Sequence, residues 1–296
     1  MAKKKVPKFK ESVGIDIGTH SVKVVHLKRI HEGFKLLNYE IRSTVPDGIE
    51  YIPSDLRPDR FSPVIAEMLR SLRINPKKIQ HLVTCIGGDN ISIKQIKTIF
   101  LPDEELESAL FFEAKKHLPI SGGEMVLDYQ VLNIEEKTNN MNVLLVATTK
   151  DQMKDHTNIL TACDLTPGIV DAEALAIANV FALNTYVEEG VFIILNIGAH
   201  RTNMVVYGPN SKFFSRDIDF GGFHMTKDIM KSKNISFEEA EKYKFEYGIK
   251  GPQAQAQSIS LSTLELSDKA TEESIAQEVK RSLRFYVKEA GSSDFR

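Results

Sequence analysis

Two stretches of this chain, residues 13–27 and 193–207, follow the same plan, and this repeat restricts the possible folds more than any other feature. They read "VGIDIGTHSVKVVHL" and "IILNIGAHRTNMVVY". Each has an apolar β-branched run, a short polar residue, a turn containing glycine and a second alternating run. Aligned, they share four residues: Ile17 with Ile197, Gly18 with Gly198, His20 with His200 and Val25 with Val205. Each copy therefore predicts a β-hairpin.

The chemistry of such a turn favours phosphate. Glycine lets the backbone come close to a ligand, and consecutive N–H groups at a bend form a concavity that binds anions. Asp16, at the end of the first strand, repels phosphate but can hold a hydrated Mg²⁺ that bridges to phosphate oxygens. An ordinary hairpin with a solvated Asp explains either copy alone. Two copies at equivalent positions favour a two-jawed phosphate clamp.

Length, composition and charge allow a globular protein with a full core. The chain has 296 residues, 42% of them hydrophobic, which suits two domains or one large split domain. A formal net charge of −2 argues against a general nucleic-acid binder. Cys85 and Cys163 are far apart and have no Cys or His beside them at metal-ligand spacing, so we expect two buried thiols in a reducing compartment.

Residues 1–10, "MAKKKVPKFK", form a basic tail. A strand follows it, without the apolar region and cleavage site of a signal peptide, and no apolar run approaches membrane-spanning length. These observations predict a cytoplasmic protein. The tail lysines can rest on an anionic membrane leaflet, although a solvated tail is the more ordinary reading.

Strands and helices alternate along the chain. Residues 11–85 predict a β-β-β-α-β unit, and residues 86–165 a separate β-α-β-β-α module whose first helix begins at Pro102 and Asp103. Residues 166–186 predict a strand and a nearly all-apolar helix, capped by Asp171 and buried between layers, which return the chain to the first unit.

Residues 187–296 predict a second domain that contains the second hairpin. A capping box of Ser236 and Glu239 begins a helix that Gly248 ends. Residues 251–273 are rich in Gln, Ser and Thr and predict a loop or weak strand. In the last helix we expect the apolar residues Leu283, Phe285 and Tyr286 to face the core.

Four motifs carry a family resemblance: "GIDIGTHSVKVVHL", "EAKKHLPISGGEMVLDYQVL", "VDAEALAIANVFAL" and "FGGFHMTKDIM". They resemble the PilM family of type IV pilus assembly proteins, relatives of the division protein FtsA in the actin-like ATPase superfamily. The resemblance implies an α/β, actin-like (ribonuclease H-like) ATPase fold with two pseudo-equivalent domains. It also implies that residues 86–165 are the inserted subdomain that PilM and FtsA share, and that ATP and Mg²⁺ bind between the domains.

The resemblance also implies roles for individual residues. The catalytic group comprises Asp16, which also holds the metal, with Glu173 and Asn196. The residues that match the two phosphate loops are Gly18, Thr19, Ser21, Lys23, Gly198, Ala199 and Thr202. Gly221 and Gly222 match the turn beside the ribose and phosphates, and Glu241 with Lys244 matches a helix pair that contacts the nucleoside. The Glu241–Lys244 spacing fits a surface ion pair equally well.

Two departures from the family pattern alter these expectations. The second loop usually ends its strand with Asp, and Asn196 lacks the negative charge that helps to hold Mg²⁺ or orient water, so we expect slow or absent hydrolysis. The family also continues beyond the final helix with a strand and a Gly-Gly turn that closes the adenine pocket. Because this sequence stops at Arg296, we expect a truncated second domain or an incomplete nucleotide site.

The function that the resemblance implies is that of a cytoplasmic adaptor peripheral to the inner membrane. It would bind the cytoplasmic N-terminal peptide of a PilN-like membrane protein in a groove beside the inserted subdomain, with nucleotide biasing the shape of the groove. One alternative is a small-molecule kinase of the same fold, for which no general base is identified in the sequence. Another is an FtsA-like membrane-associated filament protein, which differs mainly in an amphipathic C-terminal helix.

Overall fold

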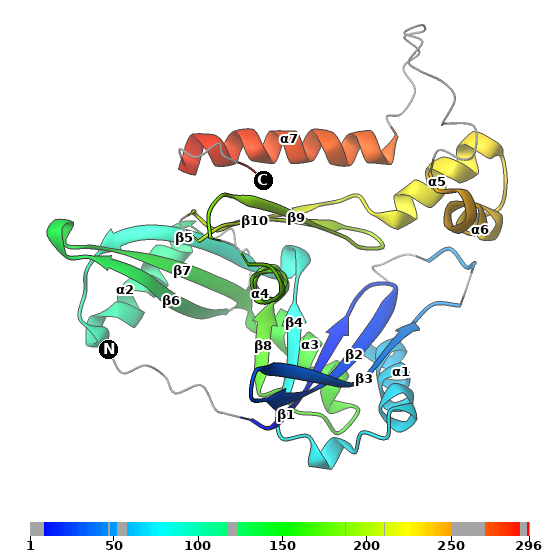
Figure 1. The fold of residues 1–296 in the computed structure, drawn as a ribbon, viewed down its shortest axis with the longest axis horizontal. Helices are drawn as coiled ribbons and strands as arrows, with labels where there is room; N and C mark the ends of the chain where they lie inside the picture. Colours follow the sequence, from blue (N-terminus) through cyan, green and yellow to red (C-terminus); the bar gives the residue numbers. More distant parts are fainter. Residues whose placement is uncertain are drawn as a thin grey trace, which may run out of the picture.

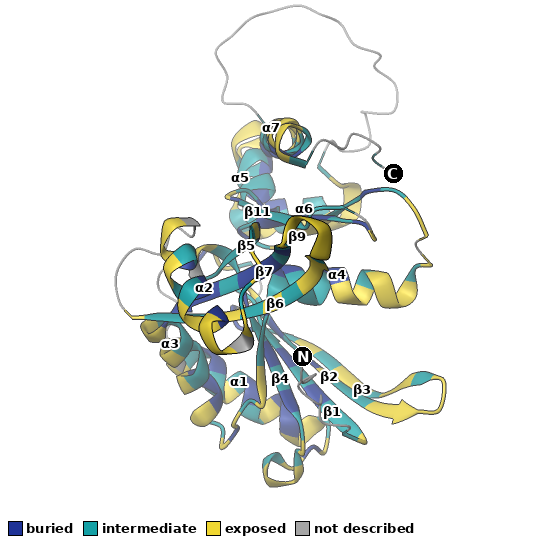
Figure 2. Ribbon diagram, turned by 90° about the vertical axis from the view of Figure 1, so that its left-hand side faces the viewer, coloured by how far each residue is buried: buried dark blue, intermediate teal, exposed yellow. Residues whose placement is uncertain are grey.

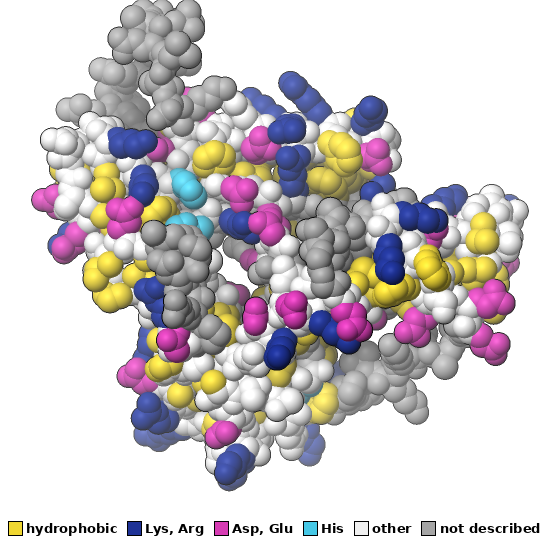
Figure 3. Space-filling model, turned by 180° about the vertical axis from the view of Figure 1, so that it is seen from behind, with side chains coloured by type: hydrophobic (Ala, Val, Ile, Leu, Met, Phe, Trp, Pro, Cys, Tyr) yellow, Lys and Arg dark blue, Asp and Glu magenta, His cyan; other side chains and the backbone are white. Residues whose placement is uncertain are grey.

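The structure is a computed structural model that describes residues 9–46, 48–51, 58–117, 124–186, 188–209, 211–249, 270–290 and 295. Within these residues the strands form three sheets, and helices pack against each of them (Figure 1). None of the described helices is long and apolar enough to cross a membrane. Acidic and basic side chains are interspersed over the face seen in Figure 3.

The first sheet has five strands in the order β3-β2-β1-β4-β8. Their bounds are Glu11–Ile17 (β1), Ser21–Ile30 (β2), Gly33–Ser43 (β3), Leu82–Ile86 (β4) and Ile169–Ala172 (β8). The first three pair antiparallel, and β4 and β8 join in parallel. Alternate residues of β1 and β2 pack under helix α1 (Pro58–Ser71) and belong to the same buried cluster: Val13, Ile15, Val22 and Val24. The predicted first hairpin is therefore present and forms the centre of this sheet.

The inserted module is a three-stranded antiparallel sheet with the order β5-β7-β6. Its strands are Ser92–Ile99 (β5), Met125–Glu135 (β6) and Asn140–Thr149 (β7). Helix α2 (Asp103–His117) covers one face with Leu106, Leu110 and Ala114, all buried as their helical spacing predicts. Leu118, the next position of that pattern, lies outside the described residues.

Helix α3 (Lys150–Thr161) follows the module in the sequence but packs elsewhere. It begins with a capping box of Thr149 and Gln152. Its buried residues Ile159 and Leu160 belong to the core cluster of the first sheet, beside α1. The domain boundaries stay a prediction, and we propose that residues 150–165 be counted with the first domain.

Helix α4 (Glu173–Asn184) corrects two expectations. Its N-cap is Ala172, without a capping side chain, and the carboxylate of Asp171 accepts a hydrogen bond from the N–H of Ala172 at 2.7 Å. The helix is also not buried on all sides. Ala174 and Ala178 pack against the sheet that contains Val205, whereas Val180 and Leu183 are exposed. Figure 2 shows this exposed stretch in yellow at one end of α4. An all-apolar sequence has no polar face to indicate which side meets water.

The second domain is built on a three-stranded antiparallel sheet with the order β11-β10-β9. Its strands are Phe192–Ile197 (β9), Thr202–Tyr207 (β10) and Phe214–Ile218 (β11). Helix α4 covers one face, and α7 (Thr271–Ala290) covers the other (Figure 1). In α7, Tyr286 is buried and Leu283 packs beside it, but Phe285 is 52% exposed, so the expectation for Phe285 was wrong.

Two helices, α5 (Gly222–Lys233) and α6 (Phe237–Tyr247), complete this domain. The capping box of Ser236 and Glu239 begins α6 and Gly248 ends it, as predicted. Most of the expected loop, residues 251–269, and residues 1–8 of the basic tail lie outside the described residues. Among the described residues, three short 3₁₀ turns connect other elements: Pro76–Lys78 (η2), Gly88–Asn90 (η3) and Glu136–Thr138 (η4).

Candidate functional site

The two hairpin turns face one cleft and have the same backbone geometry. In the first turn the N–H of Gly18 donates to the carbonyl of Ser21 at 3.1 Å, and in the second the N–H of Gly198 donates to the carbonyl of Arg201 at 2.8 Å. The cleft between them has a volume of about 840 Å³. Nine of the predicted site residues line it: Asp16, Gly18, Thr19, Ser21, Lys23, Glu173, Asn196, Gly198 and Ala199.

Neighbouring segments bind the carbonyls of both turns. The carbonyl of His20 accepts the N–H of Thr44 at 2.8 Å, and those of Gly198 and Ala199 accept the N–H groups of Gly222 and Phe223 at 3.0 and 2.7 Å. Turns held in this way by their carbonyls can offer their N–H groups to an anion.

Asp16 ends β1 at the floor of the cleft. Its carboxylate forms an ion pair with Lys23, with 2.8 Å between Oδ2 and Nζ, and its other oxygen lies 3.8 Å from the Sγ of Cys85. Burial, together with the nearby carboxylates of Asp16, Glu173 and Asp171, raises the pKa of the Cys85 thiol. Cys85 is therefore a protonated neighbour of Asp16. Cys85 and Cys163 are both only partly buried, not buried as expected.

Glu173, the first residue of α4, meets Asn196 across the cleft. Its Oε1 accepts a hydrogen bond from Asn196 Nδ2 at 2.8 Å, and its other oxygen lies against Gly87, 1.9 Å from where a Cβ would stand. Burial raises the pKa of Glu173, and the charges of Asp16 and Asp217 add to that effect. The three predicted catalytic residues thus lie around one cleft, although their roles stay predictions.

Arg201 is a cleft residue that no sequence pattern indicated. It occupies the position in the second turn that Ser21 occupies in the first. Its guanidinium binds Asp219 at 3.1 Å and forms an ion pair with Asp89, and it lies over Gly88. Asp89 is at η3, far away in sequence, so no local pattern could have indicated this contact.

His156 and Asp217 are two further cleft residues without a sequence signal. His156 comes from α3 and its Nε2 lies 2.8 Å from Thr84 Oγ1, while burial lowers its pKa. Asp217 accepts a hydrogen bond from Asn203 at 2.8 Å, and burial raises its pKa. Both environments favour the uncharged forms of these side chains.

Thr202, Gly221 and Gly222 do not line the cleft. Thr202 is fully buried and donates a hydrogen bond to the carbonyl of Phe220 at 2.8 Å. A Cβ on Gly221 would lie 2.6 Å from the carbonyl oxygen of Gly198, so only glycine fits at this close approach. The two glycines therefore connect the start of α5 to the second turn, which is a supporting position.

Glu241 and Lys244 also lie outside the lining of this cleft. Their side chains are 2.5 Å apart on α6, and Lys244 also donates to the carbonyl of Gly222 at 3.1 Å and to Thr226 Oγ1 at 2.6 Å. These contacts join α6 to the beginning of α5. A contact with a nucleoside stays a prediction.

Comparison with known proteins agrees with this architecture. Residues 14–295 match the family described as "Type IV pilus assembly protein PilM". A chain of the "PilM-PilN type IV pilus biogenesis complex" has a TM-score of 0.73 and 22% sequence identity, with 95% of this chain and 78% of that chain covered.

Two other solved structures have lower similarity. The ethanolamine utilization protein EutJ from Carboxydothermus hydrogenoformans has a TM-score of 0.45 and 17% identity, over 82% of this chain and 64% of that one. A Bacteroides thetaiotaomicron protein with an actin-like ATPase fold has a TM-score of 0.42 and 10% identity, over 76% and 75%. The predicted fold class is confirmed by the PilM match. This chain belongs to the type IV pilus assembly protein PilM family.

Proposed function

We propose that this protein is a nucleotide-binding adaptor of type IV pilus biogenesis, located in the cytoplasm at the inner membrane. It binds ATP with Mg²⁺ between the two hairpins and a PilN-type N-terminal peptide beside the inserted module. The observation that carries the first part is the pair of equivalent turns, at Gly18 and Gly198, that face one cleft. The PilM-PilN title of the similar structure supports the second part.

The cleft suits a nucleoside triphosphate in size and chemistry. Its volume of about 840 Å³ lies within the range of small-molecule sites, roughly 300–1,000 Å³. The turns supply backbone N–H groups and Lys23 supplies a cation for phosphate oxygens. In this role Lys23 exchanges its contact with Asp16 for one with the ligand.

The metal part of the proposal depends on Asp16. Among the described residues there is no group of three or more His, Cys, Asp or Glu side chains that could hold a metal by themselves. Mg²⁺ commonly keeps several waters and is bound by one or two carboxylates together with substrate phosphates, so a single Asp16 carboxylate fits that pattern. When bound, the ion neutralises phosphate charge that Asp16 alone would repel.

The site is better suited to binding than to hydrolysis. Asn196 cannot take up a proton, and its amide already binds an oxygen of Glu173 at 2.8 Å. Glu173 is therefore held against the second hairpin by this hydrogen bond. We therefore expect at most a slow ATPase, in which the nucleotide acts mainly on the relative position of the domains.

The inserted sheet offers an edge for an extended peptide. At its β5 edge, the N–H of Phe213 donates to Gln95 Oε1 at 2.9 Å, so the second domain partly covers that edge. Strand β6 forms the opposite edge and pairs with β7 alone among the described strands. We place the peptide on β6, where it can add a strand to the sheet.

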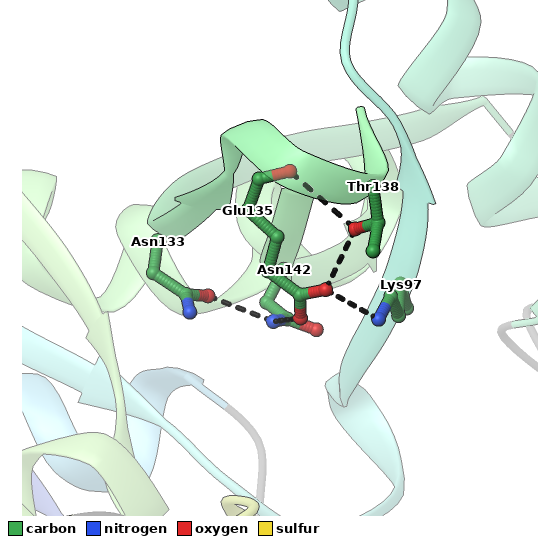
Figure 4. Close-up of polar contacts among 5 residues, drawn as sticks. All are labelled: Lys97, Asn133, Glu135, Thr138 and Asn142. Atoms are coloured by element: carbon green, nitrogen blue, oxygen red, sulfur yellow. Dashed lines mark hydrogen bonds and ion pairs between the residues drawn. The ribbon is translucent and has the colours of Figure 1, made fainter. Parts of the chain in front are cut away.

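Side chains of the inserted sheet bind one another at the end where Glu135 of β6 is paired with Asn140 of β7. Lys97 binds Glu135 at 2.7 Å, Thr138 donates to Glu135 at 2.9 Å, and Asn142 donates to Asn133 at 2.8 Å (Figure 4). These contacts link all three strands, so β6 is a firmly held edge for a peptide.

Hydrogen exchange tests the position of the peptide. Addition of a peptide with the cytoplasmic N-terminal sequence of the PilN-type partner should slow exchange at alternate amides of residues 125–135, because a new strand uses every second backbone group of an edge. The amides of residues 92–99 in β5 serve as the control and should not change. Protection confined to residues outside β6 would contradict the proposal.

A further inference from the structure

The equivalent histidines of the two turns lie on the same tyrosine. His20 and His200 occupy the same position in their turns, and the ring of Tyr51 lies 6.0 Å from the ring of His20 and 4.9 Å from that of His200, centroid to centroid. Tyr51 belongs to the connection between β3 and α1, in the first domain. One side chain of the first domain thus contacts both hairpin turns that face the cleft.

The contact with the second domain is an enclosed aromatic cluster. Tyr51 meets the ring of Phe223, at the start of α5, edge to face at 5.8 Å, and His200 lies 4.4 Å from the same ring. Tyr51 is 8% exposed and His200 9%. Packed rings with edge-to-face geometry give a contact of defined distance and orientation.

Residues beside Tyr51 fix it from both domains. Glu50 forms an ion pair with Lys227 of α5 at 2.5 Å, and Gly48, at a φ of +74°, lies against the side chain of Glu238 of α6. From the first domain, the guanidinium of Arg60 on α1 lies 5.9 Å from the Tyr51 ring centroid. The segment from Gly48 to Tyr51 therefore joins the two domains at the turns.

The buried surroundings of this aromatic cluster favour an uncharged contact between the two domains. The Nε2 atom of His200 is buried without a hydrogen-bond partner among the described residues, and burial lowers the pKa of His200 to about 4. Two polar contacts across the cleft, Arg201 with Asp89 and Asn196 with Glu173, are more exposed to solvent. Exposed pairs of this kind contribute little to holding domains together.

We propose that Tyr51 is a positioning residue that sets the distance between the two phosphate-binding turns and thereby the affinity for Mg-ATP. The inference rests on the proposed function of the cleft. The backbone hydrogen bonds of each turn go to its own domain, so we expect the distance between the turns to vary more when Tyr51 is removed. The apparent dissociation constant then rises in inverse proportion to the fraction of molecules in which both turns are in place.

The test uses Tyr51→Ala, the conservative Tyr51→Phe, and Tyr39→Ala as a matched control, because Tyr39 is a 65% exposed tyrosine of the same domain. Two properties are measured. The first is the distance between spin labels carried by unnatural amino acids at the exposed positions Glu32 and Lys233, without nucleotide, which leaves Cys85 and Cys163 unchanged. The second is Mg-ATP affinity by calorimetry.

Tyr51→Ala should broaden or lengthen the distance and weaken Mg-ATP binding about tenfold, whereas Tyr51→Phe and Tyr39→Ala should match the original chain in both. Should Tyr51→Ala fail to fold, Tyr51→Leu replaces it under the same criterion. An unchanged distance and affinity would overturn the inference. If the original chain binds no Mg-ATP, the nucleotide part of the proposed function fails, and the distance measurement still decides the role of Tyr51 in joining the turns.

Discussion

Asp16 and Lys23 are direct partners in the β1–β2 ladder, and their charged atoms lie 2.8 Å apart. The equivalent partners in the β9–β10 ladder are Asn196 and Asn203. These do not bind each other, since Asn196 donates to Glu173 and Asn203 to Asp217. The two turns therefore share a backbone plan but differ at these ladder positions, where the first has an ion pair, Asp16 with Lys23, and the second has two neutral amides.

This asymmetry predicts unequal effects of alanine at the two strand ends. Asp16→Ala removes the carboxylate expected to hold Mg²⁺ and should abolish Mg-dependent nucleotide binding. Asn196→Ala removes a neutral amide and should weaken binding much less. Calorimetry with Mg-ATP measures both, and an equal loss for the two variants, or no loss for Asp16→Ala, would contradict the asymmetric clamp.

Thr202 should affect stability without affecting the nucleotide. Its hydroxyl donates to the carbonyl of Phe220 inside the core, so Thr202→Val should lower the free energy of unfolding by about 1–3 kcal/mol by leaving that carbonyl unpaired. Mg-ATP affinity should stay unchanged because Thr202 does not line the cleft. Urea denaturation measures the change in stability, and calorimetry measures the affinity for Mg-ATP. A stable variant with lower affinity would support the phosphate-loop role that the family resemblance implies.

The adjacent glycines of α5 make a matched pair. A Cβ at Gly221 would lie 2.6 Å from the Gly198 carbonyl, whereas a Cβ at Gly222 has its nearest neighbours at an ordinary 3.8 Å. Gly221→Ala should therefore displace the second turn and lower both stability and Mg-ATP affinity, and Gly222→Ala should do neither. If Gly222→Ala instead costs affinity at unchanged stability, this glycine contacts the ligand directly.

His200 should make stability depend on pH. Its pKa is about 4 in the folded chain because of burial and the neighbouring basic side chains of His224, His20 and Lys227, against 6.5 ordinarily. Between these values the unfolded chain binds a proton that the folded chain does not, so the free energy of unfolding falls as pH drops from about 6.5 to about 4. His200→Gln should lose less stability between about pH 7 and about pH 5 in urea titrations. Equal losses in both chains would show that His200 is not held neutral.

Local sequence patterns predicted much of this fold. The period of two and the glycine turn predicted both hairpins, and the Ser236–Glu239 capping box predicted the start of α6, because each depends on residues close together in the chain. The exposed face of α4, the packing of α3 on α1 and the exposure of Phe285 were not predicted. Each depends on what covers an element in three dimensions.

The candidate site divides in the same way. Sequence alignment of the repeat brought Asp16, Gly18, Asn196 and Gly198 to one cleft, where the structure places them. The contacts of Arg201 with Asp89 and of Tyr51 with His200 join segments far apart in the sequence, and no spacing rule connects them. Contacts between residues of different domains are thus the part of the site that could be found only from the structure.

The adaptor role proposed for this protein requires that nucleotide and partner peptide bind one molecule and that each influences the binding of the other. Calorimetric titration of the chain with Mg-ATP, with and without a peptide of the partner's cytoplasmic N-terminus, tests it most directly. Both ligands should bind, and each should change the affinity of the other by the same factor, as linkage requires. Peptide binding without any binding of Mg-ATP would contradict it and would leave a scaffold whose two hairpins hold no nucleotide.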